Sequence, residues 1–233
     1  MKNSTLKKID ISIIVPCLNE QDHIQSTLSK IANSFNKSSH SFEIVVVNDG
    51  SSDKTLEKIN IFKDKNPHIA INIYNHPEPK GIGYIFNHYQ KILKGAYTRM
   101  VMGDDVDYIE THESILNYLY KYDLIIPVYT SVINKSKLRL LISTLFTKIV
   151  NLISFQKIRY YNGSVAFRSS ALKEITFIND GFGFQAEIIS KLLKKGKNYI
   201  EFETTALHRN QSNSITLNNL VKVVLILIRI LKC

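Results

Sequence analysis

The sequence predicts one α/β domain with a mostly parallel central sheet flanked by helices, followed by amphipathic helices towards the C-terminus. Two observations support this fold class. Short apolar runs alternate with stretches of helical periodicity through the first half of the chain, which is the pattern of βαβ units. The chain has 233 residues, of which 44% are hydrophobic and 21% charged, and this is enough for one sizeable globular core.

The predicted elements follow one another in a regular order. An apolar run at 11–16 indicates a buried first strand, and the spacing of Ile24, Leu28 and Ile31 indicates a helix after it. The complete set of predicted strands is 11–16, 42–47, 69–74, 99–102 and 124–128. The helices between them are predicted at 20–35, from 52 through Phe62, at 82–93 and at 113–121. No repeat or linker interrupts this order, so we expect a single domain over 1–233.

The formal net charge of +10 is unevenly placed along the chain. Residues 135–159 contain six basic residues and no acidic one, and residues 206–233 contain four more and again no acidic one. Both segments are also rich in Leu, Ile and Val, and basic amphipathic helices of this kind are typical of proteins that lie on an anionic membrane surface. A nucleic-acid partner is disfavoured, because no aromatic stacking platform or known motif accompanies the charge.

Two amphipathic helices are expected in these basic segments, at 138–155 and 217–231. In the first, Leu141, Leu145 and Leu152 fall on a broad apolar face with Ser and Thr residues opposite. In the second, the longest apolar run is far shorter than the roughly 20 residues that span a bilayer. We therefore predict that both lie in a membrane interface. The alternative is that both helices pack on the domain's own core, and for the second helix a crystal-lattice or dimer (homo-oligomer) contact is a further alternative.

The cysteines and the N-terminus favour the cytoplasmic side of that membrane. The only two cysteines, Cys17 and Cys233, lie at opposite ends of the chain, so a disulfide framework is not expected and a reducing compartment fits. Residues 1–10 are polar and basic without the apolar stretch of a signal peptide. Peripheral association with the inner face of a membrane is the prediction.

Three polar clusters, at 16–20, 48–53 and 103–107, follow predicted strands at the edge of a parallel sheet where ligands usually bind. The middle cluster taken alone is also a common turn with a helix cap. The last cluster contains three carboxylates within four residues, which repel one another unless a cation gathers them. Asp105 and Asp107, two residues apart, could both reach one hard cation if the backbone is extended. A solvated acidic loop is the alternative.

Several sequence blocks carry a family resemblance. Residues 12–20 read Ser-Ile-Ile-Val-Pro-Cys-Leu-Asn-Glu, and residues 43–55 read Glu-Ile-Val-Val-Val-Asn-Asp-Gly-Ser-Ser-Asp-Lys-Thr. These blocks and the acidic cluster after them resemble the inverting GT-A glycosyltransferases of family 2. Tyr-Asn-Gly-Ser-Val-Ala-Phe-Arg at 161–168 and Gly-Phe-Gly-Phe-Gln-Ala-Glu at 181–187 resemble the dolichol-phosphate mannose synthase-like branch of that family. The resemblance covers about 11–215.

The resemblance implies a GT-A-like fold that binds a nucleotide-diphosphate sugar. The nucleotide-sugar-binding half would span 11–107 and the acceptor half 108–215. By their positions in the family's motifs, the residues assigned to the donor site are Pro16, Asn19, Glu20, Asp49, Ser51, Lys80, Asp104, Arg168 and Ser214.

The resemblance also implies a metal and catalytic residues. Asp105 matches the last acid of the Asp-x-Asp motif, and Asp107 matches a following position that also reaches the metal. Mg²⁺ or Mn²⁺ bound there would neutralise the diphosphate as it leaves. Catalytic roles would fall to Asp105, to Arg209 near a phosphate, and to Glu187, which matches an acid that acts elsewhere in the family as general base.

The chain departs from the branch's pattern at several positions. Gly103 replaces the first acid of Asp-x-Asp, Ser164-Val165 replaces a Phe-Arg pair, and Ser212 and Ile215 replace a Gly and a Lys. The predicted function is inverting transfer of a sugar to a polyprenyl (dolichol-type) phosphate. Transfer to a saccharide hydroxyl in surface polysaccharide synthesis, with Glu187 as base, is one alternative, and a catalytically weak sugar-nucleotide-binding protein is the other.

Overall fold

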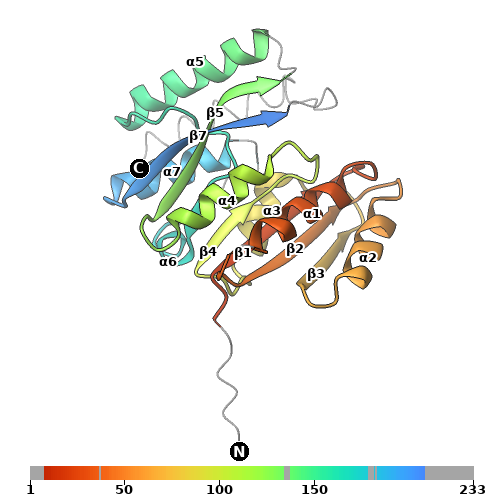
Figure 1. The fold of residues 1–233 in the computed structure, drawn as a ribbon. Coiled ribbons are helices and arrows are strands. Elements are labelled where there is room, and N and C mark those ends of the chain that lie inside the picture. The colour runs from red at the N-terminus through yellow and green to blue at the C-terminus, as the bar shows by residue number, and fades with distance from the viewer. Residues whose placement is uncertain (1–7, 37, 134–136, 178–180, 182, 208–233) are drawn as a thin grey trace, which may run out of the picture.

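The computed structural model describes residues 8–207 apart from 37, 134–136, 178–180 and 182. The strands in this part of the chain form one sheet in the order β3-β2-β1-β4-β6-β5-β7 (Figure 1). Neighbours among the first four strands are parallel: β1 (Ile11–Cys17), β2 (Phe42–Asp49), β3 (Ala70–His76) and β4 (Tyr97–Met100). β6 (Ala166–Arg168) is antiparallel to both its neighbours, β4 and β5 (Leu124–Ile133), and β5 is parallel to β7 (Tyr199–Leu207). Six of these seven strands run the same way, which confirms the predicted mostly parallel sheet.

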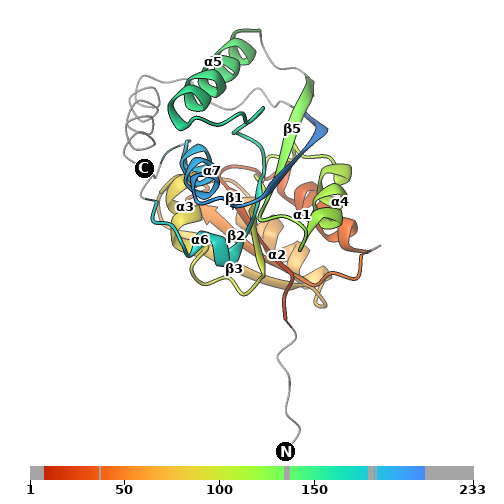
Figure 2. The same cartoon turned by 90° about the vertical axis from the view of Figure 1, so that its left-hand side faces the viewer.

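Helices cover both faces of the sheet (Figures 1 and 2). On one face, α1 (Ile24–Phe35), α2 (Thr55–Lys65) and α4 (Ile109–Tyr118) share a hydrophobic core with Ile13, Val15 and Val46. On the other, α3 (Ile82–Tyr89), α6 (Ser169–Leu172) and α7 (Phe184–Lys194) pack on Ile14, Val45 and Val47. Successive strand residues point to opposite faces, so the continuous apolar runs of β1 and β2 supply both cores. This is why every residue of β1 is buried.

The predicted elements that fall within the described residues are present, with shifted boundaries. The first helix begins at Ile24 and not at Glu20, because the carbonyl of Glu20 accepts the first turn's hydrogen bonds from His23 and Ile24. The fourth strand ends at Met100, so the last two residues of the predicted 99–102 strand belong to the loop that carries the acidic cluster. The helix predicted at 113–121 lies at 109–118.

The amphipathic helix predicted at 138–155 is α5 (Lys137–Ser154), which packs on the core with some of its apolar residues and leaves others exposed. Thr147 is 9% exposed and Ser154 1%, whereas Leu141 is 66%, Leu145 55% and Leu152 76% exposed. The Ser154 hydroxyl is satisfied locally by the carbonyl of Val150 at 2.7 Å. Leu141, Leu145 and Leu152 therefore point away from the domain core, whereas Val150 is buried in it with Phe146 and Ile153 packed beside it. The apolar residues of α5 are thus divided between the domain's own core and solvent. The helix predicted at 217–231 lies outside the described residues.

Candidate active site

Three loops meet at the carboxyl edge of the sheet, at residues 18–23 after β1, 50–54 after β2 and 101–108 after β4. Because β1 lies between β2 and β4 in the sheet, the loop of β1 is adjacent to both others. The structure thus brings together the three polar clusters singled out in the sequence. Pro16 itself is buried within β1, where its carbonyl accepts a hydrogen bond of 3.0 Å from the backbone N–H of Gly103.

The loops after β1 and β2 are joined by reciprocal backbone-to-side-chain hydrogen bonds. The N–H of Asn19 donates to the Ser51 hydroxyl at 2.9 Å, and the N–H of Ser52 donates to the Asn19 side-chain oxygen at 2.9 Å. The N–H of Glu20 donates to the Thr55 hydroxyl at 2.7 Å. The N–H of Gln21 continues the series by donating to Asp53, and the N–H of Lys54 donates back to the Gln21 side chain. Asn19 has a φ of 56°, a left-handed conformation that Asn tolerates better than most residues. We call these bonds the loop interlock.

Asp49 holds the loop that leads into α3. One carboxylate oxygen accepts from the backbone N–H of Lys80 and contacts His76 Nδ1 at 2.8 Å, and the other oxygen accepts from the N–H of Gly81. Gly81 has a φ of 87°, which only glycine adopts at little cost. Asp49, predicted to contact the base or ribose, here fixes the backbone beside that position. The Lys80 side chain is exposed and paired with Glu78.

Asp105 is held against α1. Its backbone is left-handed, with a φ of 60°, and the residue is 7% exposed. One carboxylate oxygen lies 2.9 Å from the ammonium of Lys30, and the other accepts from the Ser26 hydroxyl at 3.0 Å. Asp104, next to it on the same loop, is half-buried.

Asp107 is held on the other side of the loop, in a buried network. One carboxylate oxygen accepts from Arg99 Nη2 at 3.0 Å and from the Ser164 hydroxyl at 2.6 Å. The other accepts from the Tyr129 hydroxyl at 2.5 Å. Arg99 Nη1 lies 2.6 Å from Nδ1 of His112.

The electrostatics of this network fix its charge state. Burial alone would raise the pKa of Asp107, but Arg99 and the two hydroxyl donors lower it overall. Burial and the nearby Arg99 lower the pKa of His112 to about 3, so His112 is neutral at pH 7 and accepts from the guanidinium. Burial, together with Asp107, raises the pKa of Tyr129, which keeps the phenol protonated. Asp107 is therefore the anion that balances a buried arginine.

The acidic loop as arranged does not fit a divalent cation. The carboxylates of Asp105 and Asp107 have separate partners on opposite sides of the loop, and each uses both oxygens. In the described part of the chain, no three His, Cys, Asp or Glu side chains gather closely enough to hold a metal. The assignment of these two residues to a metal stays a prediction, and it requires Asp105 to leave Lys30.

Packing against β1 accounts for a glycine at position 103, where the Asp-x-Asp motif has its first aspartate. A Cβ atom at Gly103 would lie 2.8 Å from Cβ of Cys17 and 3.1 Å from the carbonyl oxygen of Pro16. The Thr27 hydroxyl also donates to the carbonyl of Gly103 at 3.1 Å. The loop therefore packs directly on β1 at this residue, and no space remains for an aspartate side chain.

Two further predicted residues lie apart from these loops. Arg168 is at the end of β6, which runs antiparallel, and it pairs in register with Tyr97 at the start of β4. Its guanidinium bonds Asp123 at 2.6 Å at that opposite edge of the sheet, so the structure does not bring Arg168 to the donor loops. Glu187 lies in the first turn of α7, is 1% exposed and is paired with Lys191 at 2.7 Å. Arg209 and Ser214 lie outside the described residues.

Sequence reasoning missed several residues that hold the acidic loop, among them Ser26, Thr27, Lys30, Arg99, His112, Tyr129 and Ser164. For Arg99 a signal was present, because a charged residue within a short buried strand needs a buried partner. His112 lies in α4, which directly follows the loop, and the others come from elements distant in the sequence; no local pattern marks any of them.

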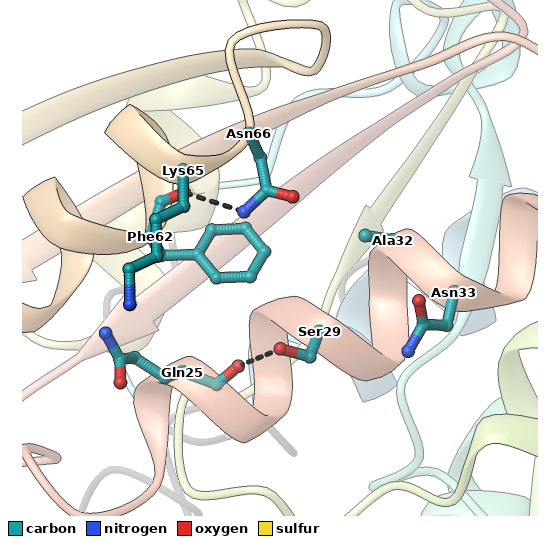
Figure 3. Close-up of a pocket in the computed structure, with 7 residues that line it drawn as sticks. All are labelled: Gln25, Ser29, Ala32, Asn33, Phe62, Lys65 and Asn66. Carbon is teal, nitrogen blue, oxygen red and sulfur yellow. Dashed lines mark hydrogen bonds between the residues drawn. The ribbon is translucent and has the colours of Figure 1, made fainter.

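Two cavities accompany the site. One of about 310 Å³ lies between α1 and α2 and contains none of the predicted site residues (Figure 3). The other, of about 320 Å³, lies between β5 and α5. Its lining residues are Val128, Tyr129, Leu140, Ser143, Thr144, Thr147, Lys148, Arg159 and Tyr160. Tyr129 connects this second cavity to Asp107 through one hydrogen bond.

The fold and these loops define the class of this protein. It is an α/β protein whose polar and acidic loops gather at the carboxyl edge of a mostly parallel sheet, which is the edge where nucleotides bind in sheets of this kind. The model of glycosyl transferase family 2 matches residues 12–200, and the chain belongs to this family.

Similar proteins agree with this assignment. Dolichyl-phosphate beta-glucosyltransferase of Dictyostelium discoideum is 26% identical over 123 residues, 51% of this chain and 38% of that protein. The alignments span 33–38% of the length of three curated relatives. Staphylococcus aureus TarS in complex with UDP-GlcNAc has a TM-score of 0.70 at 18% identity, over 97% of this chain and 67% of that chain. Mycobacterium tuberculosis glucosyl-3-phosphoglycerate synthase in complex with Mn²⁺, UDP and phosphoglyceric acid has a TM-score of 0.73 at 15% identity, over 96% and 78%. The expected GT-A-like fold is confirmed.

Proposed function

We propose that this chain is an inverting glycosyltransferase that moves a sugar from a nucleotide-diphosphate sugar to a polyprenyl phosphate at a membrane surface. Family membership supports glycosyl transfer and the donor class. The observation that carries the acceptor is the exposure of Leu141, Leu145 and Leu152 on α5, beside a cavity lined by polar residues of the same helix.

The donor would bind at the carboxyl edge, where the loop interlock gives two neighbouring loops one fixed shape. Asp49 supports the backbone at 80–81 beside them. Such preorganisation favours binding, because less chain entropy is lost when the ligand arrives. Solved structures with the same fold are complexes with UDP-GlcNAc and with UDP, which supports a nucleotide-sugar donor for this chain.

The acceptor would enter from the cavity between β5 and α5. Its lining includes two cationic side chains, Lys148 and Arg159, and the Ser143 and Thr147 hydroxyls, a set that suits a phosphate group. Arg159 is paired with Glu203 at 2.6 Å, so the phosphate would compete with that carboxylate for the guanidinium. Next to it, the exposed leucines of α5 suit a lipid chain or bilayer interface. None of the helices in the described part of the chain has the length and apolar content to span a bilayer.

The proposed chemistry is one displacement. An oxygen of the acceptor phosphate attacks the anomeric carbon, and the bond from that carbon to the donor diphosphate breaks, with its electron pair leaving on the nucleoside diphosphate. The configuration inverts. Because a lipid phosphate is already ionised at neutral pH, no general base is needed. We retain Mg²⁺ or Mn²⁺ as a predicted cofactor that would neutralise the leaving diphosphate.

The first test is thermal stabilisation by UDP, GDP, CDP and dTDP, each with and without Mn²⁺. A shift of several degrees with one nucleotide is expected, because a ligand that binds only the folded state stabilises it. That nucleotide's sugars are then assayed with a polyprenyl phosphate as acceptor. No shift with any nucleotide would refute the donor assignment, and a shift without transfer to any acceptor would favour a binding protein.

The membrane part of the proposal is tested separately by flotation with vesicles containing anionic lipid. Leu141→Ser with Leu145→Ser should reduce binding, since both side chains lie on the exposed face of α5. Ile92→Ser is the matched control, because Ile92 is 51% exposed and belongs to no amphipathic helix. Equal loss in both variants would show that general surface hydrophobicity, and not α5, drives binding.

A second candidate acceptor is a saccharide hydroxyl, with Glu187 as general base. The observation that favours it is a buried carboxylate oxygen of Glu187 that has no hydrogen-bond partner among the described residues. Glu187→Gln separates the candidates, because it should abolish transfer to a hydroxyl and spare transfer to a phosphate. Lys191→Met is the control for the ion pair, since it removes the lysine partner and keeps the carboxylate.

A further inference from the structure

Lys30 is held in the acidic loop by three groups. Its ammonium lies 2.9 Å from a carboxylate oxygen of Asp105 and 3.3 Å from the carbonyl oxygen of Asp107. It also lies over the ring of Tyr108, 5.7 Å from the centroid. All three groups favour a cation, since they are an anion, a carbonyl dipole and the face of an aromatic ring.

The position is largely withdrawn from solvent. The side chain of Lys30 is 26% exposed and that of Asp105 is 9% exposed. Screening by water is weak for such a pair, so the ammonium competes effectively with any other cation at this carboxylate. The Ser26 hydroxyl, one turn earlier in α1, occupies the second carboxylate oxygen.

We propose that Lys30 acts as an internal counter-ion that occupies the cation position at Asp105, so that a divalent metal binds there only after the lysine has been displaced. The inference rests on the proposed role of Asp105 in metal binding. It assigns α1 a part in that binding, because the helix supplies Lys30 and Ser26, which hold the carboxylate of Asp105 away from a metal. It also accounts for how Asp105 is tolerated at this edge without a metal, as Arg99 does for Asp107.

The experiment measures Mn²⁺ binding without nucleotide, by the loss of the electron paramagnetic resonance signal of free Mn²⁺. The variants are Lys30→Met, Lys30→Arg, and Lys30→Met combined with Asp105→Asn. Lys63→Met is the matched control, because it removes the same charge from an exposed position on α2. Circular dichroism establishes that each variant is folded. If Lys30→Met does not fold, Lys30→Gln replaces it, since the amide can still donate to Asp105.

Wild type, Lys30→Arg and Lys63→Met should bind Mn²⁺ weakly and alike. Lys30→Met should bind it about fivefold more tightly or better, as expected for removal of a unit charge from contact distance. The added Asp105→Asn substitution should abolish that gain. The inference is overturned if Lys30→Met binds Mn²⁺ within twofold of wild type or not at all, or if Lys63→Met gains equally. Nucleotide binding and transfer by wild type are measured independently, so a failure here leaves the proposed function standing.

Discussion

Asp107→Asn decides whether this residue anchors the fold or serves chiefly as a metal ligand. Arg99 has a side chain only 2% exposed, and Asp107 is its one anionic partner in the described network, because His112 is neutral above pH 5 and Tyr129 stays protonated. Removing one partner of a buried ion pair leaves an uncompensated charge and costs roughly 3–5 kcal/mol. An asparagine can still accept one hydrogen bond, so we expect the lower end, about 3 kcal/mol.

The assay is urea unfolding followed by circular dichroism in the presence of EDTA, which removes any metal contribution. With an m-value of about 3 kcal/mol/M for a chain of this size, the midpoint should fall by about 1 M. Asp64→Asn, on the exposed surface of α2, should change the free energy of unfolding by less than about 0.5 kcal/mol. Combining Arg99→Met with Asp107→Asn should cost at least about 1 kcal/mol less than the sum of the two single variants, since the residues are in contact. An unchanged midpoint for Asp107→Asn in EDTA, with Mn²⁺ stabilising the wild type alone, would refute the anchoring role.

Three other predictions concern the same edge of the sheet. Burial lowers the pKa of His112 to about 3, so as the pH falls this histidine takes up a proton in the unfolded chain before it does so in the folded one, and the free energy of unfolding should drop by up to about 1.4 kcal/mol per pH unit below about pH 6.5. Urea unfolding measured across this pH range should show a shallower pH dependence in His112→Gln. Gly103→Asp should lower the melting temperature and should not restore a metal ligand, because the added Cβ overlaps Cys17 and such overpacking costs about 1–3 kcal/mol. A stability equal to that of the wild type would contradict the steric argument. Asp49→Ala should destabilise the free protein by about 1–3 kcal/mol, because it leaves the N–H groups of Lys80 and Gly81 without their acceptor, and it should remove the thermal shift produced by the preferred nucleotide. A retained shift would place the donor elsewhere.

The sequence was most informative where its signal was local. The buried runs of β1 and β2 and the periodicity of α5 predicted those elements almost to the residue, since burial on both faces or on one side leaves a pattern within a few positions. β7 was not predicted, although Ile200 and Phe202 alternate with acidic residues in the manner of a strand. β6 has three residues, too few for any periodicity to appear.

In the candidate site, too, the local features were predicted from the sequence and the long-range contacts were not. The three loops were predicted because strand ends in a parallel sheet share an edge. The partners of the acidic loop were not, because Lys30 is 75 positions from Asp105 and Ser164 is 57 positions from Asp107. Such pairings are properties of the folded chain, and a single sequence carries no pattern that joins them. Arg168 illustrates the opposite error: a motif position suggested the donor site, whereas the reversed direction of β6 carries the residue to the other edge.

The loop interlock has a consequence for how this site can change through evolution. Every bond in it joins a backbone N–H of one loop to a side chain of the other, so its shape depends on a few anchoring side chains such as those of Asn19, Ser51 and Asp53. Leu18 directly precedes Asn19 and is 42% exposed, and its side chain takes no part in the interlock's side-chain hydrogen bonds. Selection can therefore vary positions of this kind without altering the loops that present them. A site built in this way can acquire a new ligand preference by single substitutions, each made at little cost to folding.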